Sequence, residues 1–317
     1  MPGVPFPVPP NMPRDPKTIF WHGTRIPAHQ ALRTRMVALE RNGASLEVDW
    51  REELVGDPET GAFMGGVVTS LLDHGSGLAC LAGVHSGGRP GGTMDLRIDY
   101  LKPSTRGEPI RVDCTCYRVT RFVAFVSGIA YHPAKPDDVI ARSACAFQVD
   151  RSGGEIVAGD DENVQLRNAP AAPLTEPFPE LVKRARETHD FSPIMRTVPY
   201  FAFLGLSVRE QDGALVTQLP GWPQHMANVA MGLLHGGVIG AQLEATAMLN
   251  LFAQGSSHVA KTISFTTEFL RPAPLRDLYA RAFVVRMGKR VANVRCEAWQ
   301  DDPNRIVAAA HGNFLLT

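Results

Sequence analysis

Two stretches of the sequence combine a Gly-Gly pair with a carboxylate at one fixed distance. Asp73 lies seven residues after Gly65-Gly66, and Glu244 lies seven residues after Gly236-Gly237. Glycine lets a ligand approach the backbone closely, and the first N–H groups of a helix have no partner within the helix. Such a terminus can polarise a carbonyl group. A nearby carboxylate can then attack the carbonyl carbon or direct a water molecule onto it. Close packing of a helix on a sheet is the structural alternative for the glycines.

Both acids interrupt segments that are otherwise apolar. Burial of an unpaired carboxylate costs free energy, so Asp73 and Glu244 need a specific reason to be there. A structural reason would be pairing with a buried arginine or capping of a loop. The same kind of residue at the same place in both stretches favours a functional role.

The spacing also predicts how the two stretches are arranged. At a rise of about 1.5 Å per residue, the acid lies roughly 10 Å along the helix from its own Gly-Gly pair. Reacting groups must approach to about 3–3.5 Å. Asp73 therefore has to work with Gly236-Gly237, and Glu244 with Gly65-Gly66. This predicts two antiparallel helices side by side, with each site composed of residues from both.

The elements around each helix repeat. A helix over 61–84 precedes alternating strand patterns at 93–101, 109–119, 122–132 and 139–149. A second helix over 235–252 precedes strands at 261–270, 276–286, 290–300 and 305–316. The two units align almost without gaps, at an offset that drifts only from 171 to 167. We infer a tandem duplication of an α+β unit in which an antiparallel sheet covers one buried helix.

The remaining segments set the expected domain boundaries. Residues 1–26 form a proline-rich arm, of which 1–20 are expected to be extended and poorly packed. The first domain spans 27–150, with a helix over 27–41 and a strand over 45–52. A linker rich in Gly, Pro and Ala covers 151–178. The second domain, 179–317, opens with a hairpin of strands 204–210 and 214–219 around Asp212-Gly213.

Composition argues against several classes of protein. The 32 basic and 32 acidic residues give a formal net charge of zero, which disfavours a nucleic-acid binder. No apolar run is long enough to predict a membrane span, and the N-terminus does not have the pattern of a secretory signal. The cysteines show no metal-ligand spacing and are expected to be reduced packing residues of a cytoplasmic protein. His22, His225, His258 and His311 form no metal set, His74 is expected to be structural, and no nucleotide or flavin fingerprint predicts a cofactor.

The ordered set of motifs resembles the hot-dog-fold acyl-CoA thioesterases of the PaaI-like type. These motifs are His235-Gly-Gly with its following acid, Tyr/Phe-Leu-x-Pro at 100–103 and 269–272, and the segment 198–205. The resemblance covers roughly 45–150 and 195–317. It implies that a curved antiparallel sheet wraps each helix, that the two units pair as a pseudo-dimer, and that the chain hydrolyses thioesters. An acyl-CoA or acyl-carrier substrate is expected, without a metal, cofactor, nucleic acid or membrane.

The resemblance also assigns roles by position. The first composite site would contain Asp73 as base or nucleophile, Gly236 or Gly237 at the carbonyl, and His235, Asn228 and Thr93. His235 would donate or accept a proton, or would only orient the loop. The second site would contain Glu244, Gly65, Gly66 and Thr262. Met64 replaces the histidine there and no asparagine precedes Gly65, so we expect this site to be degenerate.

Two further functions are compatible with the pattern. The chain could be a non-catalytic protein that binds acyl-CoA, although retention of both acids argues against that role. A hot-dog hydratase is disfavoured because neither Gly-Gly helix carries an Asp-x4-His pair. The acyl group, and whether two chains associate further, are left open by the sequence.

Overall fold

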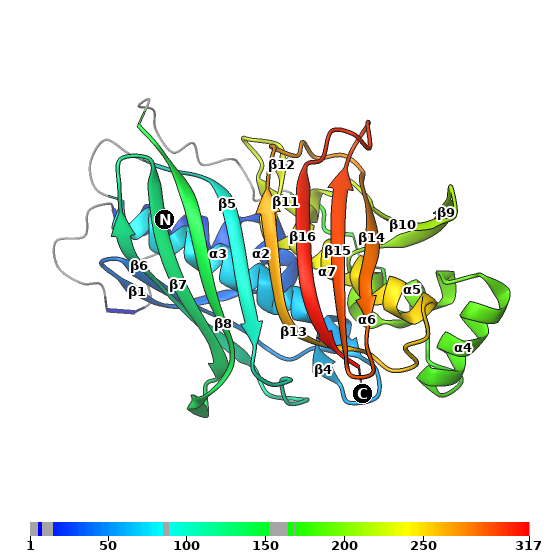
Figure 1. The fold of residues 1–317 in the computed structure, drawn as a ribbon. Coiled ribbons are helices and arrows are strands. Elements are labelled where there is room, and N and C mark those ends of the chain that lie inside the picture. The colour runs from blue at the N-terminus through cyan, green and yellow to red at the C-terminus, as the bar shows by residue number, and fades with distance from the viewer. Residues whose placement is uncertain (1–5, 8–14, 85–88, 152–163, 168, 317) are drawn as a thin grey trace.

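The computed structural model describes residues 6–7, 15–84, 89–151, 164–167 and 169–316. One twelve-stranded antiparallel sheet curves around two long helices (Figure 1). These helices are α3 (Gly65–Gly83) and α7 (Gly236–Ala253). The α+β architecture expected from the sequence is confirmed.

The described part of the first half contains three helices, one 3₁₀ turn and eight strands. Besides α3 they are α1 (Pro16–Arg25), α2 (Pro27–Leu32), β1 (Arg35–Glu40), β2 (Gly43–Val48), η1 (Glu52–Leu54), β3 (Val55–Asp57), β4 (Ala62–Phe63), β5 (Arg89–Tyr100), β6 (Ile110–Val119), β7 (Val123–His132) and β8 (Lys135–Asp150).

The second half adds three short helices before its own sheet. Besides α7 its elements are α4 (Phe178–Thr188), α5 (Ser192–Thr197), α6 (Pro199–Phe203), β9 (Ser207–Gln211), β10 (Ala214–Leu219), η2 (Pro223–His225), β11 (Met226–Asn228), β12 (Leu233–Leu234), β13 (Lys261–Phe269), β14 (Leu278–Met287), β15 (Val291–Trp299) and β16 (Ala308–Leu315).

Strand order shows the duplication directly. The sheet runs β1-β2-β6-β7-β8-β5-β13-β16-β15-β14-β10-β9, so the second half repeats the first in reverse. The halves meet where β5 pairs antiparallel with β13, with Ile98 opposite Phe265. The expected pseudo-dimer is therefore joined through one continuous sheet. In Figure 1 the strands of the two halves lie in front of α3 and α7, respectively.

Both long helices are buried on almost all sides. In α3 every residue except Gly65 and Gly77 is buried, and in α7 every residue except Gly236, Asn250 and Ala253. Their apolar side chains face the inner surface of the sheet and the other helix, as expected for helices without a polar face. Within the described residues, no helix combines the length and the hydropathy that crossing a bilayer would require.

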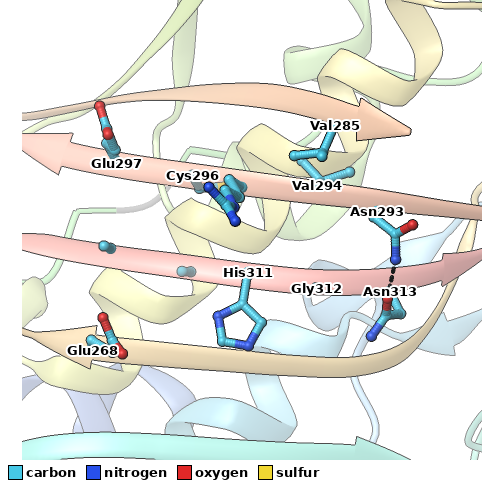
Figure 2. A pocket seen from close by; sticks show the side chains of 12 residues that line it. Glu268, Val285, Asn293, Val294, Cys296, Glu297, His311, Gly312 and Asn313 are labelled. Atoms are coloured by element: carbon cyan, nitrogen blue, oxygen red, sulfur yellow. Dashed lines mark hydrogen bonds between the residues drawn. The ribbon is translucent and has the colours of Figure 1, made fainter. Parts of the chain in front are cut away.

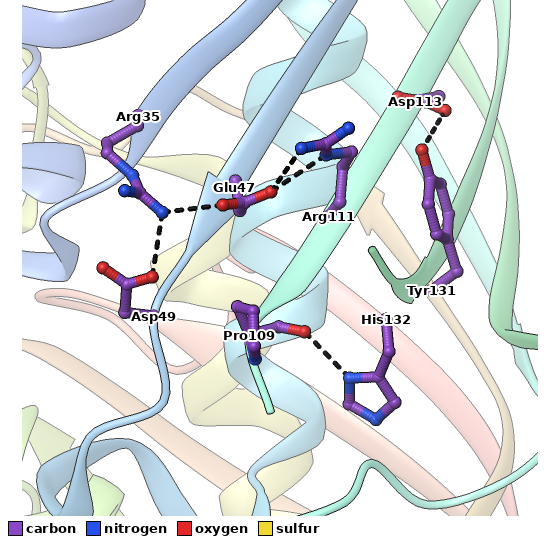
Figure 3. A network of polar contacts seen from close by, with 8 residues as sticks. All are labelled: Arg35, Glu47, Asp49, Pro109, Arg111, Asp113, Tyr131 and His132. Atoms are coloured by element: carbon purple, nitrogen blue, oxygen red, sulfur yellow. Dashed lines mark hydrogen bonds and ion pairs between the residues drawn. The ribbon is translucent and has the colours of Figure 1, made fainter. Parts of the chain in front are cut away.

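The edge of the first half is held by a polar network on the outer face (Figure 3). Glu47 of β2 accepts hydrogen bonds from Arg35 of β1 at 2.7 Å and from Arg111 of β6 at 2.9 and 2.7 Å. Nearby, the Tyr131 hydroxyl donates to Asp113 at 2.6 Å. Because side chains alternate along a strand, Glu47 points to the face opposite that of Leu46 and Val48, where the two arginines cover it and leave it 8% exposed.

Two expectations for the N-terminal region are wrong. Pro16–Arg25 is a helix capped by Asp15, and its Ile19 is fully buried in the core; the rest of the predicted arm lies mostly outside the described residues. The predicted helix over 27–41 ends at Leu32, because Arg33 takes a left-handed conformation with φ 55°. The chain then forms β1, which pairs with β2 in a hairpin. Packing of β1 on the sheet edge overrides the helical pattern there.

Smaller differences concern element boundaries. Residues 62–63 form a short strand before α3 rather than its first turn, and β2 ends at Val48. Helices α4, α5 and α6 lie between the linker and β9, in a stretch for which the sequence predicted no helix or strand. The hairpin at Asp212-Gly213 is present, with both residues at positive φ. The predicted linker lies partly outside the described residues, and its described part contains no helix or strand before α4.

Candidate active site

The two long helices bring each acid to the Gly-Gly terminus of the other unit. The Gly237 N–H at the start of α7 donates a hydrogen bond of 2.7 Å to Asp73 Oδ2 in the middle of α3. At the other end, the carboxylate of Glu244 in α7 lies beside Gly65 at the start of α3. The antiparallel arrangement that the spacing predicts is therefore present.

Within each Gly-Gly pair, the two positions require glycine for different physical reasons. A Cβ on Gly237 would lie 2.5 Å from Ser70 Cα, and a Cβ on Gly66 would lie 2.5 Å from Ala241 Cβ. The second glycine of each pair thus allows the two helices to approach. A Cβ on Gly236 would instead lie 2.8 Å from Asp73 Oδ2. The first glycine makes room for the acid, and the second packs against the other helix rather than against the sheet.

Asp73 is held by groups from two elements. It is 5% exposed, and it accepts hydrogen bonds from Thr93 Oγ1 of β5 at 2.8 Å and from the Gly237 N–H. The N-terminus of a helix stabilises negative charge, because its N–H groups and its dipole point toward the acid. The Gly236 N–H, one residue earlier, has no acceptor among the described residues.

His235 is the N-cap of α7. Its Nδ1 accepts a hydrogen bond of 3.0 Å from the Gly237 N–H and lies 3.5 Å from Asp73 Oδ2. Its backbone N–H donates to the carbonyl of His225 at 2.8 Å. Burial lowers the pKa of His235, although the charge of Asp73 acts in the opposite direction. A neutral ring whose Nδ1 accepts a hydrogen bond carries its proton on Nε2.

For Asn228, a predicted site residue, the structure describes the backbone but not the side chain. Its backbone belongs to β11, which pairs with Leu233 of β12. Its side chain lies outside the described residues. The backbone of Asn228 therefore lies in the two-stranded ribbon that precedes His235, and the contacts of its side-chain amide stay a prediction.

A cluster of three buried histidines was missed by the sequence analysis. His29 of α2 stacks on His74 of α3, with ring centroids 3.8 Å apart and planes inclined by 20°. The ring of His235 lies edge-on, with its centroid 5.0 Å from that of His29 and 5.8 Å from that of His74. His74, expected to be structural, is thus a neighbour of the site. Burial, followed by the charges of His74 and His235, lowers the pKa of His29 well below its ordinary value.

The cluster has the residue types of a metal site, since one ring nitrogen of each histidine lies within 4.8 Å of the others. The ring geometry argues against a shared ion. Imidazole binds a metal in the plane of its ring at about 2.0–2.1 Å. The planes of His29 and His74 are nearly parallel, so they do not meet within that distance of both nitrogens.

The second site has the same backbone arrangement with different side chains. Glu244 is fully buried, accepts a hydrogen bond of 2.6 Å from Thr262 Oγ1, and has no partner for Oε2 among the described residues. Burial raises its pKa from 4.5 to about 7. Met64, the N-cap of α3, makes no capping hydrogen bond through its side chain.

Aromatic rings cover the second site. Tyr200 of α6 is fully buried, and its ring lies 3.0 Å from where a Cβ of Gly66 would be. The Tyr100 hydroxyl donates to the Gly65 carbonyl at 3.1 Å. At the first site, Phe269 occupies the position that corresponds to Tyr100, 3.4 Å from where a Cβ of Gly236 would be.

A separate hollow lies on the opposite face of the sheet, over β13, β14, β15 and β16 (Figure 2). Cys296 of β15 points inward, toward the carbonyl of Leu243 in α7. Its neighbour Glu297 therefore points outward, where Glu268 and His311 also line the hollow. The hollow is thus separated from the Gly-Gly termini by the sheet itself.

Comparison with known proteins identifies the family of both halves. The model of the thioesterase superfamily (4HBT) matches residues 60–144 and 231–307, which together make up more than half of the chain. Each match contains one Gly-Gly helix and its acid. No match was found among curated proteins.

Solved structures share the fold over nearly their whole length. A structure from Novosphingobium aromaticivorans, assigned as a thioesterase, is 13% identical with a TM-score of 0.59 and covers 89% of this chain and 98% of its own. A hot-dog-fold protein of unknown function from Alicyclobacillus acidocaldarius is 14% identical, with a TM-score of 0.57 and coverages of 92% and 98%. The acyl-CoA thioesterase II TesB2 of Mycobacterium marinum is 15% identical, with a TM-score of 0.50 and coverages of 92% and 98%. The chain is a double hot-dog protein, and it belongs to the thioesterase superfamily.

Proposed function

We propose that this chain hydrolyses the thioester of an acyl-CoA or acyl-carrier substrate, in the manner of PaaI-like enzymes, at the first composite site. The observation that carries the proposal is the contact between Asp73 and the N-terminus of α7. A carboxylate, a neutral imidazole and helix N–H groups converge there from two units of a chain in the thioesterase superfamily.

The carbonyl oxygen of the thioester accepts a hydrogen bond from the Gly236 N–H. That group has no acceptor among the described residues, and it stands at the positive end of the α7 dipole. The Gly237 N–H holds Asp73 Oδ2, so the acid lies next to the carbonyl carbon. In this arrangement the Gly236 N–H binds the substrate and the Gly237 N–H binds the acid.

Asp73 then completes the hydrolysis in one of two ways. As a general base it takes a proton from water, whose oxygen bonds to the carbonyl carbon while the C–S bond breaks. As a nucleophile it forms an acyl anhydride, which water then cleaves. In both routes the sulfur leaves as a thiolate, which gains a proton, and the products are a free acid and a thiol.

The second site does not turn over in this proposal. Burial raises the pKa of Glu244 to about 7, so below that pH the carboxyl is mostly protonated, and a protonated carboxyl is neither a base nor a nucleophile. The Tyr200 ring lies 3.0 Å from where a Cβ of Gly66 would be, at the glycine that corresponds to Gly237. Both observations support one working site in each chain.

The test is release of free thiol from a panel of acyl-CoA esters with short, long and aromatic acyl groups. We expect turnover of at least one ester by the intact chain. An acyl-CoA-binding protein without catalysis is the alternative, which the replacement of the capping histidine by Met64 at the second site favours. Calorimetry on the same panel would show binding without thiol release in that case, and this result would overturn the proposal.

A further inference from the structure

We propose that His29 is a positioning residue for the first site, which fixes the tautomer of His235 through a hydrogen bond from His235 Nε2–H to His29 Nε2, direct or through one water. This inference rests on the proposed function and adds to it a residue outside both segments that match the thioesterase superfamily. His29 is carried by α2, a helix of the N-terminal region.

The hydrogen bonds on both sides of the pair allow matching tautomers. His235 Nδ1 accepts from the Gly237 N–H, so the proton of the neutral ring is on Nε2. His29 Nδ1 lies 3.0 Å from Thr34 Oγ1, a hydroxyl that can accept a hydrogen bond. With its proton on Nδ1, His29 presents a free lone pair at Nε2. One ring thus needs an acceptor and the other offers one.

His29 Nε2 needs a partner for its own stability. The side chain is 1% exposed, and Nε2 has no hydrogen-bond partner among the described residues. An unsatisfied buried polar atom costs about 1–3 kcal/mol. One ring nitrogen of each histidine lies within 4.8 Å of one nitrogen of the other two, a span that one water bridges with two hydrogen bonds of roughly 2.9 Å.

The second unit supports the coupling of the two histidines. Residues 26–33 (IPAHQALR) align with residues 198–205 (VPYFAFLG), and both segments end in a left-handed residue, Arg33 at φ 55° and Gly205 at φ 65°. His29 therefore corresponds to Phe201, and His235 corresponds to Met64. Where one histidine is replaced by an apolar residue, so is the other.

The consequence for catalysis follows from the position of His235 Nδ1. If the proton moved to Nδ1, the ring would face the Gly237 N–H with a second donor and would donate to Asp73 Oδ2, now 3.5 Å away. That contact would compete for the oxygen that acts on the thioester. The orientation of a histidine is set by the bond that its other nitrogen makes, so His29 acts on Asp73 through His235.

The experiment compares His29→Phe with His29→Gln. Phenylalanine is expected to fit, because Phe201 is fully packed at the same place in α6, and glutamine retains an acceptor. We expect kcat of His29→Phe to fall by on the order of tenfold to a hundredfold with little change in KM, and His29→Gln to recover most of it. Phe201→Leu is the matched control in the other unit.

Nitrogen NMR of ¹⁵N-histidine-labelled protein supplies a readout independent of turnover. We expect His235 to carry its proton on Nε2 in the wild type and to lose this single tautomer in His29→Phe. An unchanged His235 signal in His29→Phe overturns the inference, as does an equal loss of kcat in the Phe and Gln variants. Stoichiometric zinc that disappears in His29→Phe would overturn it in favour of a metal site. Failure of the wild type to release thiol would refute the proposed function alone, since the NMR comparison would still decide the His29–His235 contact.

Discussion

The two composite sites share a backbone and differ in what their side chains allow. At the start of α7, Asp73 receives the Gly237 N–H at 2.7 Å and has a histidine beside it. At the start of α3, Glu244 is fully buried, only one of its oxygens has a hydrogen-bond partner among the described residues, and the capping residue is Met64. A duplicated fold therefore supplies two equivalent helix termini, and the neighbouring side chains give the two acids different surroundings.

The short helices that precede each unit extend this contrast. Helix α2 packs on η2 and α6 packs on η1, so each lies over one composite site. Helix α2 brings Ala28 and His29, whereas α6 brings Tyr200 and Phe201 at the corresponding positions. The first site thus has a small residue and a polar residue at the positions where the second site has two aromatic residues. The two aligned helices thus bring different side chains to the two sites, which fits the proposal of one working site.

The largest difference in activity is expected between substitutions of the two acids. Asp73→Asn is expected to lower thiol release by about 10²–10⁴-fold, because the amide neither accepts a proton nor attacks a carbonyl. Glu244→Gln should retain most of the activity. Both variants are nearly isosteric, so steady-state assays on equally folded protein compare chemistry rather than packing. If Glu244→Gln were the inactive variant, the assignment of the working site would be reversed.

The first glycine of each pair offers the next contrast. A Cβ in Gly236→Ala would lie 2.8 Å from Asp73 Oδ2 and would displace the carboxylate. We expect kcat/KM to fall by about tenfold to a hundredfold, as for a small misplacement of a reacting group. Gly65→Ala would displace Glu244 instead and should lower the melting temperature with little loss of specific activity. Equal losses of activity in the two variants would contradict the comparison.

Stability should respond to pH through Glu244. Its folded pKa of about 7 exceeds the ordinary 4.5, so between these values the folded state binds a proton that the unfolded state lacks. The free energy of unfolding from this group therefore decreases as pH rises from about 4.5 to about 7 and is constant above. Glu244→Gln should remove this dependence and stabilise the protein at pH 8 by about 1–3 kcal/mol relative to the wild type. Urea denaturation at pH 5 and pH 8 measures both effects.

The smallest effect should come from the threonines that bond each acid. Thr93→Val removes the 2.8 Å hydrogen bond to Asp73 Oδ1 and should lower kcat by roughly tenfold, the equivalent of one hydrogen bond to a charged group. Thr262→Val removes the bond that holds down the pKa of Glu244, so that pKa should rise further. Thiol release should be unchanged in Thr262→Val. A loss of activity in that variant alone would show that the second site takes part in catalysis.

The central geometry was predictable because it depends on fixed dimensions. Helix rise is constant, so the separation of Gly66 from Asp73 was enough to predict that the acid serves the other unit. Strand periodicity predicted β5 and β13 to within a few residues. The repeated order of motifs predicted the duplication, which the two superfamily matches and the mirrored strand order confirm.

The N-terminal region could not be predicted in the same way. Residues 27–41 suit a helix locally, yet Arg33 ends it and β1 pairs with β2. His29 looked unremarkable because the residues it meets, His74 and His235, are 45 and 206 positions away in the chain. The alignment of 26–33 with 198–205 was the one signal available in the sequence, and it marks a position rather than a contact.

The sequence by itself determined the family, the duplication and the pairing of Asp73 with the glycines of the other unit. These features follow from residue types at fixed spacings within single elements. Only the tertiary structure decided which glycine makes room for the acid, where the aromatic residues of α6 lie, and that His29 joins the first site. Such contacts depend on how elements pack across long sequence separations, and no local pattern encodes the distance between side chains that only folding brings together.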